Sequence, residues 1–343
     1  MPKLKIAHLV DDITAGGVMR LLDFIRTDPG MSETATHEVH AVQRGALGLR
    51  KVDADIVVSH LSVSWRTLPA LVGLRASHVG QPLIHVEHSY TRHFAALNVP
   101  RPGRFATLLR IAYSLFDRVV AVSSDQGAWL KQIGVVSEAS LRVITPMVSL
   151  EGFAALPDPA SPPRRIGAIG RLHRQKGFDV LIPAFRALKR PDIELVIVGE
   201  GPERAQLEAL AGGDPRIRFT GHVTDPVGAM AGVDAVAVPS RWEAYGLVAR
   251  EARAAGRPVL VSAHDGLSDQ SREGAILVTD YTEAAWSDAL EKLVSGRLTA
   301  GDRSDPALAA SRFRSEWSSL FADVFGDAAL PDPRQDGSVT EAA

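Results

Sequence analysis

Cysteine is absent from this chain of 343 residues, which excludes disulfide bonds, thiolate catalysis and cysteine-ligated metal sites. No stretch reaches the roughly 18 consecutive apolar residues that a transmembrane helix requires. The first residues, Met-Pro-Lys-Leu-Lys, lead directly into a predicted strand, which argues against a signal peptide. We therefore expect a cytoplasmic protein.

An excess of either charge is also lacking. The formal net charge is −2, with 45% hydrophobic and 23% charged residues, so nothing global points to a nucleic-acid partner. The charge is uneven along the chain, however. Residues 1–150 hold 16 Lys and Arg against 12 Asp and Glu, and the remainder holds 22 against 28. The length predicts about two domains.

The two familiar phosphate-binding fingerprints are missing. Gly16-Gly17 follows a strand without fitting G-x-G-x-x-G, and Gly170–Gly177 does not fit the Walker pattern. His85 and His88 face opposite sides of a strand and lack further metal ligands. Asp53-Ala54-Asp55 precedes a strand, so it lies at the edge of the sheet opposite to the edge where ligands bind. We therefore expect neither a metal nor a cofactor.

Short apolar segments of strand type alternate with amphipathic helical segments along the chain. This alternation indicates an α/β fold with parallel strands, right-handed crossovers and ligands at the carboxyl ends of the strands. Each half shows the pattern, so we predict two Rossmann-like domains facing across a cleft. The predicted strands are Lys5–Val10, Val39–Val42, Ile56–His60, Leu83–Val86, Val119–Ser123, Leu141–Ile144, Ile166–Ile169, Ile193–Val198, Ile217–Phe219, Asp234–Val238, Val259–Ser262 and Ile276–Val278.

The segment Glu151–Pro163 separates the halves, because it holds four prolines and shows no periodicity. We place the domains at 1–150 and 164–305, with the linker at 151–163. Residues 306–326 form a predicted final helix. Residues 327–343 are polar and are expected to be disordered.

The stretch Pro239–Gly256 has the features of a ligand site. It follows a buried strand and opens a helix near Tyr245, which ends at the glycine and proline beyond it. The first amides of a helix are unpaired donors at its positive end, so they bind anions readily. Those amides belong to Gly246, Leu247 and Val248.

Two carboxylates, Glu243 and Glu251, stand eight residues apart around these amides. Glu251 lies about 7 Å along the helix axis from Gly246, close to the step from a nucleotide diphosphate to its ribose hydroxyls. Glu243 lies in the loop before the helix. It faces the group attached to the phosphate that is farther from the ribose. Taken alone, two solvated glutamates explain the spacing better, so the interpretation depends on partners elsewhere.

Candidate partners lie in other loops at strand ends. Arg171 and Lys176 suit a diphosphate, although two surface cations explain them equally well. Gly16-Gly17 lets the backbone approach a ligand, or forms a plain turn. Gly199 begins a turn that either approaches a nucleotide base or is only a turn. His88, just past a strand end, suits contact with substrate.

A basic segment covers residues 91–118, with five arginines against one acid, Asp117. Apolar residues at helical spacing accompany the arginines. The segment is either an ordinary helix with a solvated face, or a basic patch for an anionic partner or an acidic membrane surface.

Taken in order, the motifs resemble one known family. G-G-V, H-S after the fourth strand, G-R-L…K-G, V-G-E-G-P and P-S-R-W-E-A-Y-G-L-V-x-x-E-A are similar to the motifs of the retaining GT-B glycosyltransferases of family 4, or group 1. The resemblance is dense over about 164–300 and looser over 1–150. It implies a metal-independent, hexosyltransferase-like enzyme that moves a sugar from a nucleotide-diphosphate donor to an acceptor hydroxyl.

The resemblance also implies residue roles. It makes 1–150 the acceptor side and 164–305 the donor domain, with helix 306–326 crossing back to the first. Arg171 and Lys176 match the cations on the donor diphosphate, Glu251 the ribose-binding glutamate, and Glu243 the carboxylate near the donor sugar. The predicted catalytic residues are His88, Arg171, Lys176 and Glu243, and the predicted donor-binding residues are Gly16, Gly17, Gly199, His222, Tyr245, Gly246, Leu247, Val248 and Glu251.

Four departures from the family pattern bear on substrates. Tyr245 replaces the usual Phe, and Thr145–Ser149 reads T-P-M-V-S in place of P-N-G-V-D. Residues 264–269 read H-D-G-L-S-D where G-G-x-P-E is common, which leaves the donor sugar open. The first domain lacks one strand–helix unit between 43 and 52, which leaves acceptor recognition open.

Two other functions stay open: a GT-B nucleotide-sugar epimerase, and a sugar-nucleotide-binding protein without turnover. A glycan or lipid-linked acceptor, polysaccharide or glycolipid assembly, and peripheral contact of residues 92–118 with the inner face of the membrane are expected from the family alone. The sequence does not identify the donor sugar, nucleotide base, linkage or oligomeric state.

Overall fold

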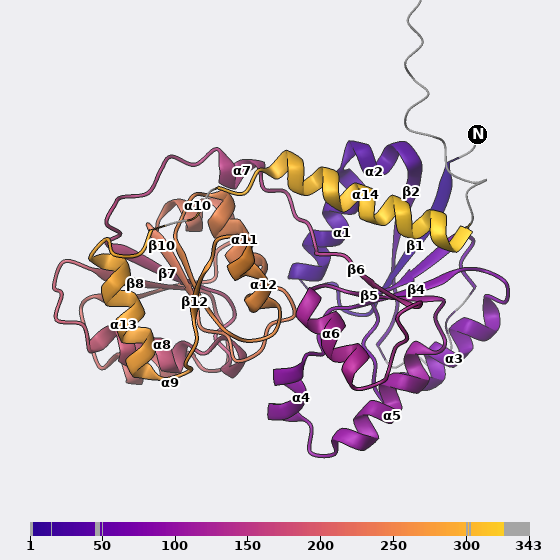
Figure 1. The fold of residues 1–343 in the computed structure, drawn as a ribbon, viewed down its shortest axis with the longest axis horizontal. Coiled ribbons are helices and arrows are strands. Elements are labelled where there is room, and N and C mark those ends of the chain that lie inside the picture. Colours follow the sequence, from indigo (N-terminus) through magenta and orange to yellow (C-terminus); the bar gives the residue numbers. More distant parts are fainter. Residues whose placement is uncertain are drawn as a thin grey trace, which may run out of the picture.

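The chain folds into two parallel six-stranded sheets, one in each half, as the computed structural model in Figure 1 shows. The structure describes residues 3–14, 16–44, 49, 51–299, 301 and 303–325. The predicted disordered tail, 327–343, lies outside the described residues. The α/β class with two Rossmann-like sheets is confirmed.

The N-terminal sheet has the strand order β2-β1-β3-β4-β5-β6, and every neighbouring pair is parallel. Its strands are Leu4–Val10 (β1), Ala35–Ala41 (β2), Ile56–Ser59 (β3), Leu83–Glu87 (β4), Arg118–Ala121 (β5) and Leu141–Val143 (β6). The helices of this half are Gly17–Thr27 (α1), Pro29–Thr34 (α2), Leu68–Ser77 (α3), Arg92–Asn98 (α4), Pro102–Tyr113 (α5) and Ser124–Gln132 (α6).

The C-terminal sheet has the order β12-β11-β10-β7-β8-β9 and is also parallel. Its strands are Arg165–Ile169 (β7), Glu194–Val198 (β8), Ile217–Gly221 (β9), Ala235–Val238 (β10), Val259–Ser262 (β11) and Ile276–Val278 (β12). Its helices are Phe178–Arg186 (α8), Arg204–Ala211 (α9), Pro226–Ala231 (α10), Leu247–Ala254 (α11), Gly266–Arg272 (α12) and Glu283–Val294 (α13), with a 3₁₀ turn at Arg174–Lys176 (η1).

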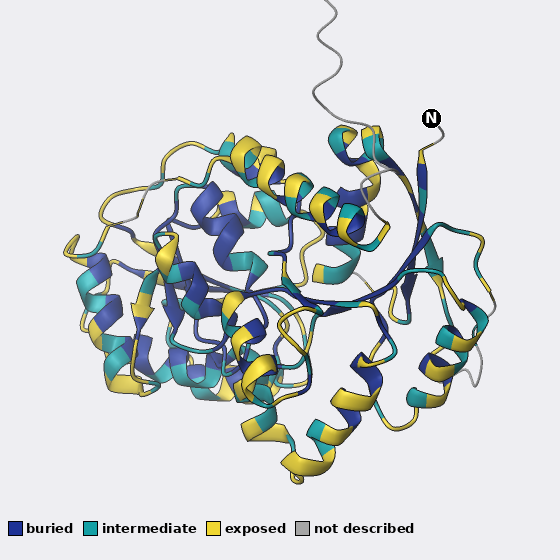
Figure 2. Ribbon diagram, turned by 45° about the vertical axis from the view of Figure 1, so that its right-hand side comes forward, coloured by how far each residue is buried: buried dark blue, intermediate teal, exposed yellow. Residues whose placement is uncertain are grey.

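The central strands are buried on both faces, which is why they appear in the sequence as continuous apolar runs. All residues of β3, β4, β10 and β11 are buried. Parallel sheets require this burial because their crossover helices cover both faces. Figure 2 shows the buried strands running through the centre, with the exposed sides of the helices outside.

One hydrophobic core extends from the N-terminal sheet into the C-terminal sheet, because it includes buried residues of β3, β4, β10 and α11. The last helix, Pro306–Phe325 (α14), adds to this core and lies along the N-terminal half (Figure 1). Phe313 meets Phe24 edge to face, with ring centroids 5.6 Å apart. Arg314 forms two hydrogen bonds to Asp28, at 2.7 and 2.8 Å. Helix α14 is therefore attached to the first helices of the N-terminal half.

The segment 151–163 differs from the linker expected there. It begins with a one-turn helix, Glu151–Ala154 (α7), and Phe153 is 2% exposed within the shared core. One buried aromatic ring suffices to order a short turn, and a single apolar residue gives no periodicity for sequence analysis to detect.

Candidate functional site

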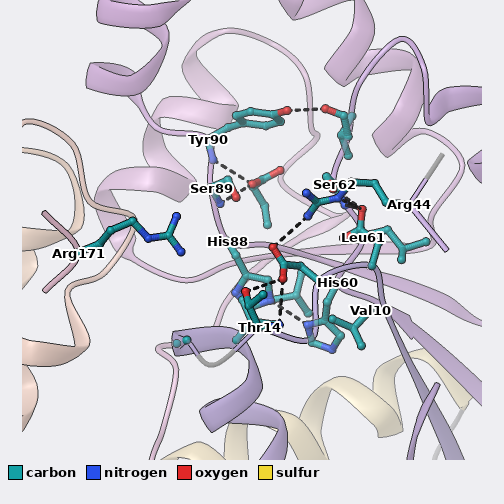
Figure 3. Close-up of a pocket in the computed structure, with 18 residues that line it drawn as sticks. Val10, Thr14, Arg44, His60, Leu61, Ser62, His88, Ser89, Tyr90 and Arg171 are labelled. Carbon is teal, nitrogen blue, oxygen red and sulfur yellow. Dashed lines mark hydrogen bonds and ion pairs between the residues drawn. The ribbon is translucent and has the colours of Figure 1, made fainter. Parts of the chain in front are cut away.

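A cavity of about 270 Å³ lies at the carboxyl ends of three N-terminal strands and reaches the C-terminal half (Figure 3). Its walls come from the segments after β1, β3 and β4, and Arg171 closes it from the other half. The predicted residues that line it are Gly16, Gly17, His88 and Arg171. Ligands of open α/β sheets bind at this edge, so the cavity is the candidate for substrate.

The start of α11 forms the second part of the site. Gly246 caps the helix with φ +91°, a conformation that favours glycine, and an added Cβ would lie 2.5 Å from the side chain of Leu267. No side chain of the described residues caps the helix, so its first amides keep their capacity to bind an anion. Glu243, just before it, pairs with Lys176, whose Nζ lies 2.5 Å from Oε2.

Glu251 lies deeper on the same helix and pairs across the cleft with Arg20 of α1. Arg20 Nη1 and Glu251 Oε1 are 2.6 Å apart, and the side chain of Glu251 is 3% exposed. Burial raises the pKa of Glu251, while the charges of Arg20 and Lys176 oppose that shift. Oε1 is thus engaged, and Oε2 has no hydrogen-bond partner among the residues that the structure describes.

Two predicted glycines have steric reasons to be glycine. A Cβ on Gly17 would lie 3.0 Å from Leu247 of the opposite half, so α1 and α11 approach closely here. Gly199 has φ +141°, and its added Cβ would lie 1.9 Å from the carbonyl oxygen of Gly170. Gly16 is different, because its φ of −172° is ordinary extended backbone.

Arg171 of the C-terminal half faces the N-terminal half, and His88 of the N-terminal half faces the C-terminal half. Figure 3 shows Arg171 extending from the C-terminal half towards the loop that carries His88 and Ser89. Arg171 is exposed, and its side chain forms no hydrogen bond with the described part of the chain. His88 Nε2 lies 2.8 Å from Nδ1 of His60, and burial lowers the pKa of His88 to about 4. His85 lies apart, buried in the core.

Two predicted donor-binding side chains, those of Tyr245 and His222, do not line the cavity. Tyr245 is buried, and its hydroxyl accepts a hydrogen bond from Arg250 at 2.9 Å. Its ring is therefore packed in the core that the two halves share, and only its main chain adjoins the start of α11. His222 is exposed after β9, beside the strand end that carries Gly199, and makes no side-chain hydrogen bond with described residues.

Asp265 connects the two halves from the loop 264–269, whose sequence departs from the family pattern. Its carboxylate accepts hydrogen bonds from Thr91 Oγ1 at 2.6 Å and from the amide of His93 at 3.0 Å. These donors form the first turn of α4. Asp265 has φ +51° although it is not glycine. Helix α4 of the N-terminal half is therefore tied to the loop next to Glu243.

Sequence analysis also missed Arg20 and His60. Arg20 stands three residues after Gly17, on the first turn of α1, and that spacing is a usable signal because such a residue faces the same cleft. His60 follows β3 just as His88 follows β4. Within the described residues, no group of three or more His, Asp or Glu is arranged to hold a metal ion.

Both halves match known family models. Residues 163–296 match the glycosyl transferases group 1 model, and residues 17–151 match the glycosyltransferase family 4 model. The D-inositol 3-phosphate glycosyltransferase of Stackebrandtia nassauensis is 28% identical over 312 residues, covering 79% of this chain and 67% of the relative. The enzyme of the same name from Mycobacterium bovis is 29% identical over 279 residues, covering 73% and 55%. The chain thus spans about half to two thirds of these relatives.

Solved structures share the fold. Anabaena HepE in complex with UDP has a TM-score of 0.67 at 19% identity, covering 93% of this chain and all of HepE. Sucrose-phosphate synthase from Thermosynechococcus elongatus has a TM-score of 0.65 at 21% identity, covering 93% and 95%. With both halves matched by family models and the fold shared, this chain belongs to the group 1, or family 4, glycosyltransferases.

Proposed function

We propose that this enzyme transfers a hexosyl group from a nucleotide-diphosphate sugar to an acceptor hydroxyl, with retention of the anomeric configuration. The observation that carries the proposal is the convergence of Lys176, Glu243 and the open α11 terminus beside the Arg20–Glu251 pair. The HepE structures with UDP and glucose support a nucleotide sugar as donor.

The diphosphate would be held and stabilised electrostatically. As the bond between the sugar and the phosphate breaks, negative charge grows on the leaving diphosphate. Lys176, the amides at the start of α11 and the guanidinium of Arg171 would stabilise that charge. Such stabilisation does not require a metal ion, so we propose metal-independent transfer.

The nucleoside is held by Glu251. Its free Oε2 accepts the hydroxyls of the ribose, while Arg20 balances the buried charge at Oε1. Glu243 keeps Lys176 in place and adjoins the sugar. The base would lie near the turn of Gly199, where glycine brings two backbone segments into contact.

The acceptor enters from the N-terminal cavity, on the same face of the sugar as the leaving group. The C1–O bond to the phosphate breaks, the acceptor oxygen bonds to C1, and a phosphate oxygen takes the acceptor proton. The positions of His88 and Arg171 on opposite walls of that cavity support this arrangement. Retention follows because the departing and arriving oxygens share one face.

A donor screen tests the proposal. The purified enzyme is incubated with UDP, GDP and ADP sugars, each with sugar and inositol-phosphate acceptors, with and without EDTA, and product anomers are read by NMR. We expect one nucleotide class to give a product of unchanged anomeric configuration that EDTA does not abolish. An inverted product, or an epimerised donor formed without acceptor, would contradict the proposal.

By analogy with the family, we propose a glycan or lipid-linked acceptor at the cytoplasmic face of a membrane. Of the basic residues 92–118, Arg104 lies over the ring of Trp65 at 5.3 Å and Arg110 bonds the carbonyl of Gly134. No helix among the described residues is long and apolar enough to cross a membrane. Vesicle co-sedimentation with and without anionic lipid tests peripheral contact.

A further inference from the structure

One carboxylate oxygen of Asp265 binds both halves of the chain at once. Its Oδ2 accepts a hydrogen bond from the hydroxyl of Thr91 at 2.6 Å and a longer one from the amide of Glu243 at 3.4 Å. Its Oδ1 accepts from the amide of His93 at 3.0 Å and lies 2.9 Å from Nδ1 of the same residue. The side chain of Asp265 is fully buried, and the proposed transfer gives it no role.

The residue after Asp265 holds Glu243 a second time. The amide of Gly266 donates to the carbonyl of Glu243 at 3.0 Å. A Cβ added to Gly266 would lie 2.0 Å from the carbonyl oxygen of Ala244, so the two loops are in close contact. Asp265 and Gly266 thus bind both the amide and the carbonyl of Glu243, whose carboxylate in turn pairs with Lys176.

Asp265 has a backbone conformation that disfavours residues other than glycine. Its φ is +51° and its ψ is −133°, and it is the only non-glycine residue with positive φ in the described part of the chain. Such a conformation persists only where surrounding contacts enforce it. Thr91 and His93 supply these contacts, and the His93 ring nitrogen donates because an ionised carboxylate only accepts. The shape of this loop therefore depends on the docking of α4.

A second carboxylate of the same segment binds another helix of the N-terminal half. Asp269, on α12, accepts a hydrogen bond at 2.5 Å from the amide of Ser124, the first residue of α6. In Figure 1, α12 adjoins α6. The segment 265–269 therefore binds the starts of two helices of the opposite half, which fixes how α4 meets the loop of Glu243.

We propose that Asp265 is a positioning residue that couples the docking of α4 to the placement of Glu243. When α4 is docked, the carboxylate of Asp265 is held in place and in turn holds the loop that carries Glu243. A misplacement of about 1 Å near the reacting groups can lower a rate about 100-fold. The effect on transfer rests on the proposed function, in which Glu243 adjoins the donor sugar, whereas the ordering of the loop by α4 does not.

Hydrogen exchange read by mass spectrometry tests the coupling in the full-length enzyme without substrate. Thr91→Val removes the hydroxyl that Asp265 accepts and keeps the shape of the side chain. We expect the amides of the segment 242–246 to exchange about tenfold faster, although Thr91 lies in the other half, because the loop then opens more easily. Thr91→Ser keeps the hydroxyl and should restore wild-type exchange.

Thr282→Val is the matched control. Thr282 caps α13 by accepting the amide of Ala285 at 3.2 Å, just as Thr91 caps α4 by accepting the amide of Phe94 at 3.1 Å. The control removes the same kind of cap within the half that carries Glu243, and should leave exchange of the segment 242–246 unchanged. Unchanged exchange in Thr91→Val, or an equal increase in both variants, would overturn the proposal.

Asp265→Asn approaches the contact from the other side. An amide cannot accept from all of these donors, so we expect the same faster exchange of the segment 242–246. The double variant with Thr91→Val should exchange little faster than either single variant, because both changes break one contact. Additive effects would show that Asp265 and Thr91 act on the loop independently, and would reject the coupling.

Transfer kinetics give the second readout, at a temperature where every variant is folded. We expect Thr91→Val and Asp265→Asn to lower kcat about tenfold with the KM for the donor within about twofold, and Thr91→Ser to recover most of the loss. Faster exchange with wild-type kcat would disprove the effect on transfer. Absence of any transfer by the wild type would refute the proposed function instead, and the exchange result would still decide the coupling.

Discussion

The two sheets of this enzyme have the same number of strands but differ in where the strand order reverses. The C-terminal order, β12-β11-β10-β7-β8-β9, is the complete doubly wound arrangement, with three strands on each side of the switch between β7 and β10. The N-terminal order, β2-β1-β3-β4-β5-β6, has only β1 and β2 on the corresponding side. On the other side the N-terminal sheet has four strands, β3 to β6, so both sheets have six strands and the switch lies one strand nearer the edge in the N-terminal half.

The halves differ in chemistry as well. The C-terminal half contributes Arg171, Lys176 and a helix terminus, which suit an anion. The N-terminal half contributes neutral histidines and Arg20. Eight of the 11 histidines stand before residue 100. Under the proposed function, charge stabilisation would belong to the C-terminal half and hydroxyl recognition to the N-terminal half.

Removing a cation from the C-terminal half should have the largest effect. We expect Lys176→Ala to lower kcat by 10²–10³, the magnitude of losing one transition-state donor. In the N-terminal half, His88→Ala should cost only about tenfold, because it loses one hydrogen bond. Lys189→Ala, an exposed lysine beyond α8, is the matched control. Equal losses for Lys176 and His88 would contradict the division between the halves.

Replacing glycine by alanine should cost more stability at Gly199, in the C-terminal half, than at Gly16, in the N-terminal half. Gly199→Ala combines a disfavoured φ with a collision against Gly170, and should cost about 3 kcal/mol of unfolding free energy. Gly16→Ala meets nothing closer than 3.7 Å and should cost less than about 0.5 kcal/mol. Urea unfolding monitored by circular dichroism measures both. Comparable costs would show that the N-terminal loop is as tightly constrained as the C-terminal turn.

The pair that joins the halves should make stability depend on pH. Burial raises the pKa of Glu251 above its ordinary 4.5, so its ionised form disfavours folding, and stability falls as pH rises through the raised pKa. Arg20→Leu removes the cation that compensates the buried charge of Glu251, so the stability should fall further as the pH rises. Because Arg20 is about a third exposed, we expect about 2 kcal/mol at pH 8 and almost none at pH 4. A loss independent of pH would reject this pairing.

The attachment of α14 to the N-terminal half should have the smallest effect. Arg314 holds the pKa of Asp28 below its ordinary value, so the pair stabilises the fold above that value and is lost as pH falls through the lowered pKa. Because Arg314 is 37% exposed, Arg314→Ala should cost only about 1 kcal/mol at pH 7. The exposed Arg312–Glu316 pair on the same helix provides the control, Arg312→Ala. Equal thermal shifts for both would contradict a role for Asp28.

Most strands were predictable to within a residue or two, because a buried parallel strand is a short apolar run. The main exception was β2, predicted at Val39–Val42 and found at Ala35–Ala41. It is an edge strand with polar residues at Thr36, His37 and Glu38, so its first half does not form an apolar run. The one-turn helix at Phe153 was hidden for a similar reason.

In the site, local motifs were accessible and long-range pairs were not. Glu243, Gly246 and Glu251 belong to one stretch, so their relation follows from helix geometry. Arg20 and Glu251 are separated by 231 positions, and no local pattern joins them. Asp265 meets the first turn of α4 only because the two halves are packed together.

The sequence by itself determined the alternation of strands and helices, the open amide terminus before α11 and the family, because each resides in residues close along the chain. Tertiary structure alone decided which cation faces which carboxylate and that Asp265 meets the first turn of α4. Those relations depend on strand order and on the approach of two sheets, which contacts between distant residues establish.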